Sequence, residues 1–330
     1  MMSFEKFKNK EVLITGGLGF IGSNLTIRLV ELGANVTVID SMIPEYGGNI
    51  KNIESVKDKI TINYSDIRDE YSVKYLIQQK DYLFNLAGQT SHIDSMINPF
   101  QDLEINAKSQ LSILEACKKY NSAIKIVFAS TRQLYGKPQY LPVDELHPII
   151  PVDVNGINKL SGESYHLLYN EVYNIDACVL RLTNTYGPRL RVKDARQTFL
   201  GIWIRTVLEN KPFLIFGNGE QVRDYNYVDD VVDAFLLAAL SEKSNGKIYN
   251  LGDENPISLN TTAKILIQEN KNGESKLVPF PEDRKNIDIG DFYGDFKKIK
   301  NDLGWSPKVS FQEGIRKTIA YYKENLNYYI

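Results

Sequence analysis

The chain has 330 residues, of which 43% are hydrophobic and 24% charged, so we expect a globular protein with one large α/β unit and a smaller lobe. Its formal net charge of −2 provides no basic surface for phosphate backbones, which argues against a nucleic-acid partner. No apolar run approaches the roughly 18 residues of a membrane span, and the charged N-terminal segment lacks a signal-peptide pattern, so we expect a cytoplasmic protein without membrane association.

The first half of the sequence alternates short β-rich runs with helical patterns. Strands are predicted at Glu11–Thr15, Asn35–Asp40, Ile60–Tyr64, Tyr82–Leu86, Lys125–Ala129 and Asp176–Leu182. Helices are predicted at Phe20–Leu32, Tyr71–Gln79, Pro99–Tyr120 and Val154–Tyr173. Continuous apolar strands separated by helices are typical of a parallel sheet covered on both faces. The fold class is therefore predicted to be α/β, with a doubly wound Rossmann domain.

From about Thr183 the pattern becomes less regular, because segments with proline and glycine interrupt the helices. Helices are predicted here at Phe199–Asn210, Asp229–Leu240, Ser258–Asn270 and Phe311–Asn325. We predict that residues 1–182 form the Rossmann domain and residues 183–330 mainly a smaller C-terminal lobe, with elements shared across the boundary.

A glycine recurs at every third residue between the first strand and the first helix, at Gly16, Gly19 and Gly22. Glycine permits a tight turn and the close approach of a pyrophosphate, while the helix offers free N–H groups and the positive end of its dipole. The next strand ends on Asp40, whose carboxylate suits ribose hydroxyls and repels a 2′-phosphate. The pattern predicts NAD rather than NADP as the cofactor.

A second acidic residue follows the third predicted strand. Asp66 is a candidate to accept a hydrogen bond from the adenine amino group, and Ile67 to cover the adenine ring. The alternative for Asp66 is a helix cap.

Further motifs follow in chain order: NLAGQTSH, FASTRQLYG, NKLSGE, LRLTNTYGPR, GEQVRDYNYVDDVVDA and LGWSP. Together with ITGGLGFIGS, they make the chain resemble the extended short-chain dehydrogenases/reductases, specifically the nucleotide-sugar epimerases and dehydratases, from about residue 10 to residue 325. The resemblance implies an enzyme of carbohydrate biosynthesis that uses NAD and binds a nucleotide-diphosphate sugar.

The resemblance also implies roles for individual residues. The cofactor-binding set comprises Gly16, Gly19, Phe20, Ile21, Gly22, Asp40, Asp66, Ile67, Leu86, Ala87, Gly88 and Lys159. The substrate-binding set comprises Gln89, Arg132, Gln133, Asn184, Arg223 and Arg284. Within the second set, Asn184 is expected near the diphosphate, and Arg223 and Arg284 are expected to pair with it, because guanidinium donors engage phosphate oxygens bidentately.

The catalytic positions depart from the family pattern at one residue. Family members combine a Ser or Thr with a Tyr-x-x-x-Lys pair, in which tyrosinate removes the proton of a sugar hydroxyl. Thr131 and Lys159 occupy the expected places, but Asn155 stands where the tyrosine belongs. An amide does not titrate near neutrality, so Asn155 orients a hydroxyl at most.

Three interpretations of this departure stay open: another group supplies the base, the reaction differs, or catalysis has been lost while binding persists. Lys159 is one candidate base, since burial beside the positive cofactor ring lowers the pKa of an ammonium. His92 is the other, since neutral imidazole accepts a proton near pH 7. The alternative for His92 is a structural, hydrogen-bonded histidine. Asn106, inside a helical pattern, is predicted either to bond a backbone group or to serve the site.

Arg132 and Gln133 stand where sugar 4,6-dehydratases of this family present Asp-Glu, the pair that removes the C6 hydroxyl. Neither residue performs that acid–base chemistry at neutral pH, so dehydration is disfavoured. We expect an NAD-dependent epimerase that acts through a transient keto-sugar. The alternatives are a net dehydrogenase, an atypical dehydratase, or a catalytically silent protein that binds nucleotide sugar or NAD.

The predicted helices Pro99–Tyr120 and Val154–Tyr173 carry many apolar residues, which favours a homodimer formed through their outer faces. No metal site is predicted.

Overall fold

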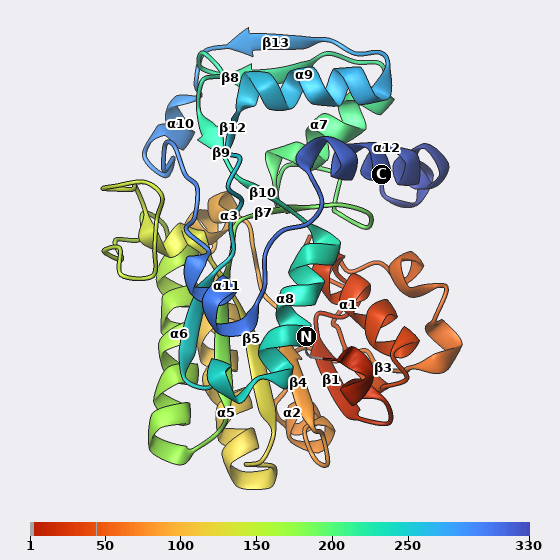
Figure 1. Ribbon diagram of the computed structural model, residues 1–330, viewed down its shortest axis with the longest axis vertical. Helices are drawn as coiled ribbons and strands as arrows, with labels where there is room; N and C mark the ends of the chain where they lie inside the picture. The colour runs from red at the N-terminus through yellow and green to blue at the C-terminus, as the bar shows by residue number, and fades with distance from the viewer. Residues whose placement is uncertain (1–2, 44) are drawn as a thin grey trace.

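Seven parallel strands form one sheet in the larger part of the molecule (Figure 1). The computed structural model describes residues 3–43 and 45–330, with the side chains of all of these except residues 283 and 284. The strands run in the order β11-β6-β5-β4-β1-β2-β3, and every neighbouring pair is parallel. Their bounds are β1 Glu11–Thr15, β2 Asn35–Ile39, β3 Thr61–Asn63, β4 Tyr82–Asn85, β5 Lys125–Thr131, β6 Ala177–Leu182 and β11 Lys247–Asn250. The chain order reverses between β1 and β4, which confirms the doubly wound α/β prediction.

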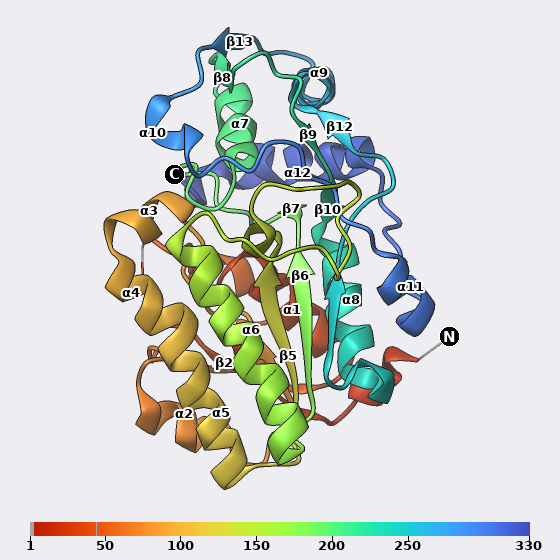
Figure 2. The same ribbon diagram turned by 90° about the vertical axis from the view of Figure 1, so that its left-hand side faces the viewer.

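Helices cover both faces of this sheet (Figure 2). One face packs on α1 (Phe20–Glu31) and α8 (Val228–Leu240). The opposite face packs on α2 (Glu70–Leu76), α5 (Ser109–Tyr120) and α6 (Val154–Tyr173). The central strands are buried on both sides, and for this reason β1 and β5 are buried nearly throughout and contain continuous apolar runs at residues 12–14 and 126–129 instead of alternating.

The predicted helix Pro99–Tyr120 is not continuous. It consists of α4 (Pro99–Leu103), one π-helical turn at Glu104–Lys108, and α5. A short helix, α3 (His92–Ile97), precedes it and was not predicted; Ser91 caps its start and Asn98 separates it from α4. Polar caps thus separate α3 from α4, whereas the π-helical turn joins α4 to α5 without a side-chain cap; hydrophobic periodicity indicated only one helix.

The smaller lobe lies above the carboxyl ends of the strands (Figure 1). Its helices are α7 Phe199–Leu208, α9 Leu259–Asn270, α10 Glu282–Lys285 and α12 Phe311–Asn325. Three two-stranded sheets are formed by β7 Asn184–Tyr186, β8 Phe213–Phe216, β9 Val222–Arg223, β10 Tyr225–Tyr227, β12 Ile257–Ser258 and β13 Ser275–Val278. The lobe has its own core, which includes Trp203, Phe213 and Ile319.

Residues after 183 belong to both parts of the molecule. The chain returns from the lobe to contribute α8, β11 and α11 (Lys297–Leu303), and Trp305 packs in the same core as α1 and α8. The described residues include no helix that is both long and apolar enough to cross a bilayer.

Candidate active site

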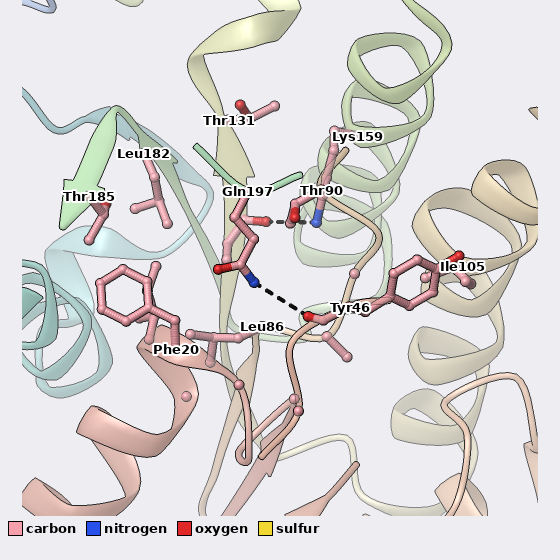
Figure 3. Close-up of a pocket in the computed structure, with 18 of the residues that line it drawn as sticks. Phe20, Tyr46, Leu86, Thr90, Ile105, Thr131, Lys159, Leu182, Thr185 and Gln197 are labelled. Carbon is pink, nitrogen blue, oxygen red and sulfur yellow. Dashed lines mark hydrogen bonds between the residues drawn. The ribbon is translucent and has the colours of Figure 1, made fainter. Parts of the chain in front are cut away.

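A cleft runs along the carboxyl ends of the central strands, where the strand order reverses (Figure 3). All the predicted cofactor-binding residues line it. So do Thr131, Arg132, Asn155, His92 and Asn184. Three predicted substrate-binding residues do not reach this cleft, because Gln89, Gln133 and Arg223 are buried behind its walls. The predicted Arg284 side chain lies outside the described side chains.

The glycine turn between β1 and α1 has the geometry of a pyrophosphate cradle. Gly16 has a φ of +70°, in the left-handed region that favours glycine. A Cβ on Gly22 would lie 2.1 Å from the Gly16 carbonyl oxygen, so no side chain fits there. Gly19 caps α1 without a side-chain hydrogen bond, which leaves the N–H groups of the first turn directed at the cleft. This end of the cleft therefore fits the diphosphate of a dinucleotide.

Asp40 lies at the end of β2, on the same wall. Its Oδ2 accepts a hydrogen bond from the Leu18 N–H (3.0 Å) and its Oδ1 from the Met42 N–H (2.9 Å). Burial raises the pKa of this carboxyl, and the two backbone hydrogen bonds oppose the shift. Each oxygen retains a lone pair, so the carboxylate has capacity for ribose hydroxyls.

The carboxylate of Asp66 is held by its neighbour instead of being free. Arg68 donates to it from Nε (3.0 Å) and from Nη2 (2.8 Å). Burial would raise the pKa of Asp66, but the Arg68 hydrogen bonds and charge outweigh it and lower that pKa. Asp66 therefore faces the cleft as a charged group, beside Ile67.

Lys159 projects from α6 toward the centre of the cleft, and its Nζ donates to the Ala129 carbonyl at 3.2 Å (Figure 3). Burial lowers the pKa of Lys159 to about 8, with the charge of Asp102 opposing the shift. A Cβ on Gly88 would lie 2.8 Å from this nitrogen, so the glycine gives the ammonium room. Lys159 is mostly protonated at neutral pH and partly neutral above pH 8.

The amide nitrogen of Asn155 is hydrogen-bonded within the protein. Its Nδ2 donates to the Gln89 carbonyl (2.8 Å) and to Asp102 Oδ2 (3.1 Å), which uses both amide hydrogens. Only Oδ1, an acceptor, is left for a ligand. Asn155 can therefore accept a hydrogen bond from a ligand hydroxyl, but an amide oxygen cannot act as its base.

Asp102 is a functional candidate that the sequence analysis missed. Its side chain is buried, and besides Asn155 it accepts hydrogen bonds from Asn106 (3.0 Å) and Asn158 (2.7 Å). Asn106 also donates to the Gln89 carbonyl (2.9 Å), so its amide bonds a backbone group of another segment. The spacing was an available signal: positions 155, 158 and 159 share one helix face, and 102 and 106 are one turn apart.

His92 lies at the start of α3 and faces a buried carboxylate. Its Nδ1 is 3.1 Å from Asp153 Oδ2, and its side chain is 36% exposed toward the cleft. Asp153 caps α6 by accepting from the Gly156 N–H (2.7 Å) and also accepts from Gln133 Nε2 (2.8 Å). Burial opposes ionisation of Asp153, but hydrogen bonds from His92, Gly156 and Gln133 hold its pKa below the ordinary value.

His92 Nδ1 lies within ion-pair distance of Asp153 Oδ2 but makes no hydrogen bond of regular geometry among the described residues, so a small rotation of the ring is needed for the pair to form an oriented general base. A carboxylate that accepts the Nδ1–H of an imidazole selects the tautomer in which Nε2 carries a lone pair. The same carboxylate stabilises the imidazolium that forms when Nε2 takes a proton. Sequence analysis identified His92 but missed Asp153, which reads as an ordinary helix cap.

The remaining polar residues of this wall differ in which of their hydrogen-bonding groups are still available to a ligand. Thr131 Oγ accepts from the Gln133 N–H (3.2 Å), so its own proton stays available to a ligand. Arg132 Nη2 donates to Asn184 Oδ1 (3.1 Å). The guanidinium of Arg223 instead bonds the carbonyls of Val222 (2.9 Å) and Gly290, and thus ties two loops together.

Comparisons with known proteins agree with this architecture. The sequence model of the GDP-mannose 4,6 dehydratase family matches residues 13–318. A putative UDP-glucose 4-epimerase of Methanocaldococcus jannaschii is 36% identical over 316 residues, which cover 95% of this chain and 99% of that protein.

Two solved structures share the fold. The UDP-glucose 4-epimerase of Thermotoga maritima, determined with UDP-glucose, has a TM-score of 0.88 and 33% identity, covering 96% of this chain and 99% of that one. The UDP-glucose 4-epimerase of Thermus thermophilus, determined with NAD, has a TM-score of 0.84 and 30% identity, covering 95% and 99%.

Proposed function

Because this chain belongs to the extended short-chain dehydrogenase/reductase family of nucleotide-sugar epimerases and dehydratases, and is an NAD-dependent enzyme, we propose that it epimerises a nucleotide-diphosphate sugar through a transient keto-sugar. One observation carries the proposal: His92 lies on the cleft wall that also bears Thr131 and Lys159, with its Nδ1 3.1 Å from the buried Asp153 carboxylate, and this arrangement supports a role for His92 as the base. An oriented base in this place supports turnover over silent binding.

Epimerisation is favoured over dehydration by the two residues that follow Thr131. Removal of a C6 hydroxyl needs an acid and a base beside that carbon. Arg132 stays protonated at neutral pH, and the Gln133 amide is buried and donates to Asp153. Neither side chain exchanges a proton with a sugar, so the chemistry stops at oxidation and reduction of one ring carbon.

The residues of the cleft divide the work as follows. NAD, when bound, supplies the reversible acceptance of a hydride from the sugar carbon. His92 Nε2 takes the proton of the sugar hydroxyl, and Asp153 stabilises the resulting imidazolium. The Thr131 hydroxyl and the Asn155 Oδ1 orient the sugar hydroxyls, and the Lys159 ammonium donates to hydroxyls near the cofactor ring.

The test is a screen of the purified protein with UDP-, GDP-, dTDP- and CDP-sugars, starting from whichever nucleotide mass spectrometry finds co-purified. We expect a sugar inverted at one carbon by NMR, with no net absorbance at the NADH band. Accumulating NADH would instead indicate a net dehydrogenase, loss of water a dehydratase, and tight binding without turnover a silent protein.

We also propose that the enzyme is a homodimer. The outer faces of α4, α5 and α6, which lie side by side in Figure 2, expose Phe100, Leu103, Leu111, Ile157, Leu168 and Val172. An apolar surface of this kind is costly in water and is typical of an isologous interface. Light scattering should give twice the chain mass, and replacing Leu168 and Val172 by glutamate should give the monomer.

A further inference from the structure

The guanidinium of Arg132 is held at the end of the cleft that carries Thr131, Asn155 and His92, which we call the sugar end. Arg132 directly follows Thr131 at the end of β5, and its side chain lines the cleft. The guanidinium carbon lies 4.9 Å from the centre of the Phe292 ring, and Nη2 donates to Asn184. Stacking and this one hydrogen bond fix the position of the guanidinium, but neither contact supplies a negative charge to neutralise it.

The structure provides no directly bonded carboxylate for that charge among the described residues, although the charges of Asp224 and Asp288 act on it from nearby. Nη1 is buried without a hydrogen-bond partner, and no ion pair joins Arg132 to a carboxylate there. Burial and, to a smaller extent, the nearby charge of Arg223 together lower the pKa of Arg132 to about 10. Even so, the group carries its charge at neutral pH, and a part-buried charge without a bonded carboxylate is costly.

Two carboxylates lie in the neighbourhood, and both are engaged elsewhere. Asp224 accepts from the Thr183 hydroxyl at Oδ1 and from the Gly294 N–H at Oδ2 (2.9 Å). Asp288 accepts from Gln221 Nε2 (2.7 Å), with its other oxygen 3.8 Å from Arg223 Nη2.

A fully buried arginine away from the cleft shows how this fold neutralises such a group internally. Arg181, on the neighbouring strand β6, is 2% exposed. It donates to both oxygens of Glu163, at 3.1 Å from Nε, and to the Tyr135 hydroxyl at 2.6 Å. Arg181 thus has an internal carboxylate, whereas Arg132, which faces the cleft, does not.

From this contrast we propose that Arg132 binds an anionic group of the substrate, and that this group is a carboxylate on the sugar. The substrate class is then a nucleotide-diphosphate uronic acid, an inference that rests on the proposed function. A planar carboxylate matches the guanidinium fork and supplies the acceptor that Nη1 lacks. The adjacency of Arg132 to Thr131 places the anion on the reacting sugar, and the diphosphate is the other source of anionic oxygen that the test must separate.

The experiment compares three ligands by calorimetry with the NAD-loaded protein: UDP, UDP-glucose and UDP-glucuronate. The corresponding hexose and hexuronate are used if another nucleotide binds better. The two sugars differ only at C6, so their affinity ratio reports the carboxylate. We expect the uronate to bind about 10- to 150-fold more tightly than the hexose, the range for a hydrogen bond between charged groups.

Arg132→Gln should abolish this preference while changing the affinities for UDP and UDP-glucose little, and Arg132→Lys should restore part of it. Unchanged melting temperatures would show that both variants fold; if Arg132→Gln does not, the ligand comparison on the wild type and on Arg132→Lys decides. Equal weakening of all three ligands would assign Arg132 to the diphosphate and overturn the sugar carboxylate. Equal affinities of wild type for hexose and hexuronate would also overturn it. Failure of every nucleotide and nucleotide sugar to bind would reject the proposed function itself, and the uronic acid with it.

Discussion

The two ends of the cleft are built in different ways. At the cofactor end, one continuous segment from Thr15 to Ser23 makes the turn, the N-cap and the helix start, and it offers backbone groups to a ligand. At the sugar end, side chains from α3, α4, β5 and α6 meet although they lie far apart in the chain. A site made of backbone tolerates few residue types, whereas a site made of side chains can lose one group and recruit another.

The hydrogen bonds at the sugar end show how Asn155 fits in the place of the family tyrosine. Asn155 stands in the place of the expected tyrosine and bonds the same two acceptors as Asn106, namely Asp102 and the Gln89 carbonyl. In the proposed mechanism the proton-accepting function passes to His92, which lies beside Asp153, the residue that caps the helix carrying Asn155. The amide donors of Asn155 and Asn106 are all used, whereas Asn106 Oδ1 and Gln89 Oε1 are buried without a hydrogen-bond partner among the described residues.

The largest effect is expected for His92→Gln, which keeps a polar side chain but removes the base. The turnover number should fall about 10²- to 10⁴-fold, while the dissociation constant for NAD stays unchanged because the cofactor end is untouched. Stopped-flow kinetics and calorimetry measure the two quantities. Asp153→Asn, which retains the helix cap, should reproduce part of the loss. Wild-type turnover in His92→Gln would return the role of base to Lys159.

Asn155→Tyr restores the family spacing to Lys159 and tests whether the network has replaced the tyrosine. The phenol removes two donors from buried acceptors and adds bulk to a packed wall, so the free energy of unfolding should fall by roughly 2–4 kcal/mol. We expect no gain in turnover. Denaturant titration and single-turnover absorbance at the NADH band check both points, with Asn155→Ala as the control that adds no bulk. A large gain in rate would show that the site had only lost its base.

Gly22→Ala addresses the cofactor end. Its Cβ would meet a backbone oxygen at 2.1 Å, so the turn must shift, at a cost of about 1–3 kcal/mol that should weaken NAD binding about 5- to 150-fold. Ser23→Ala is the matched control, since it removes only a hydroxyl that bonds the Phe20 carbonyl. Unaltered NAD affinity in Gly22→Ala would contradict the backbone cradle.

The smallest effect is expected for Lys159→Arg, and the informative measurement is the pH dependence of kcat/KM. Because burial lowers the pKa of Lys159 to about 8, its ammonium is present below that pH and is lost above it. If the reaction needs the positive charge of Lys159, kcat/KM of the wild type declines above about pH 8. The arginine variant keeps its charge, so its kcat/KM is about 10-fold lower but does not decline in this range. If Lys159 were the base, kcat/KM would instead rise through pH 8.

Much of the fold and of the cofactor end is determined by the sequence alone. Apolar strands, helix periodicity and the spacing of Gly16, Gly19 and Gly22 depend on neighbours within a few residues, so they are visible in one dimension. The same holds for Thr131 and Lys159, which stand in ordered motifs at the ends of β5 and in α6. Element ends shifted slightly, because caps and turn geometry act over single residues.

Only the tertiary structure decided which polar residues meet. Asp153 approaches His92 because α3 packs against the start of α6, and Asp102 gathers three amides because α4 lies along that helix. Packing also turned Arg223 away from the cleft and left Arg132 facing it, and it returned β11 to the sheet from the second half of the chain. These contacts join residues that are tens of positions apart in the sequence. Local periodicity does not predict such contacts, because they depend on how whole helices and strands pack together.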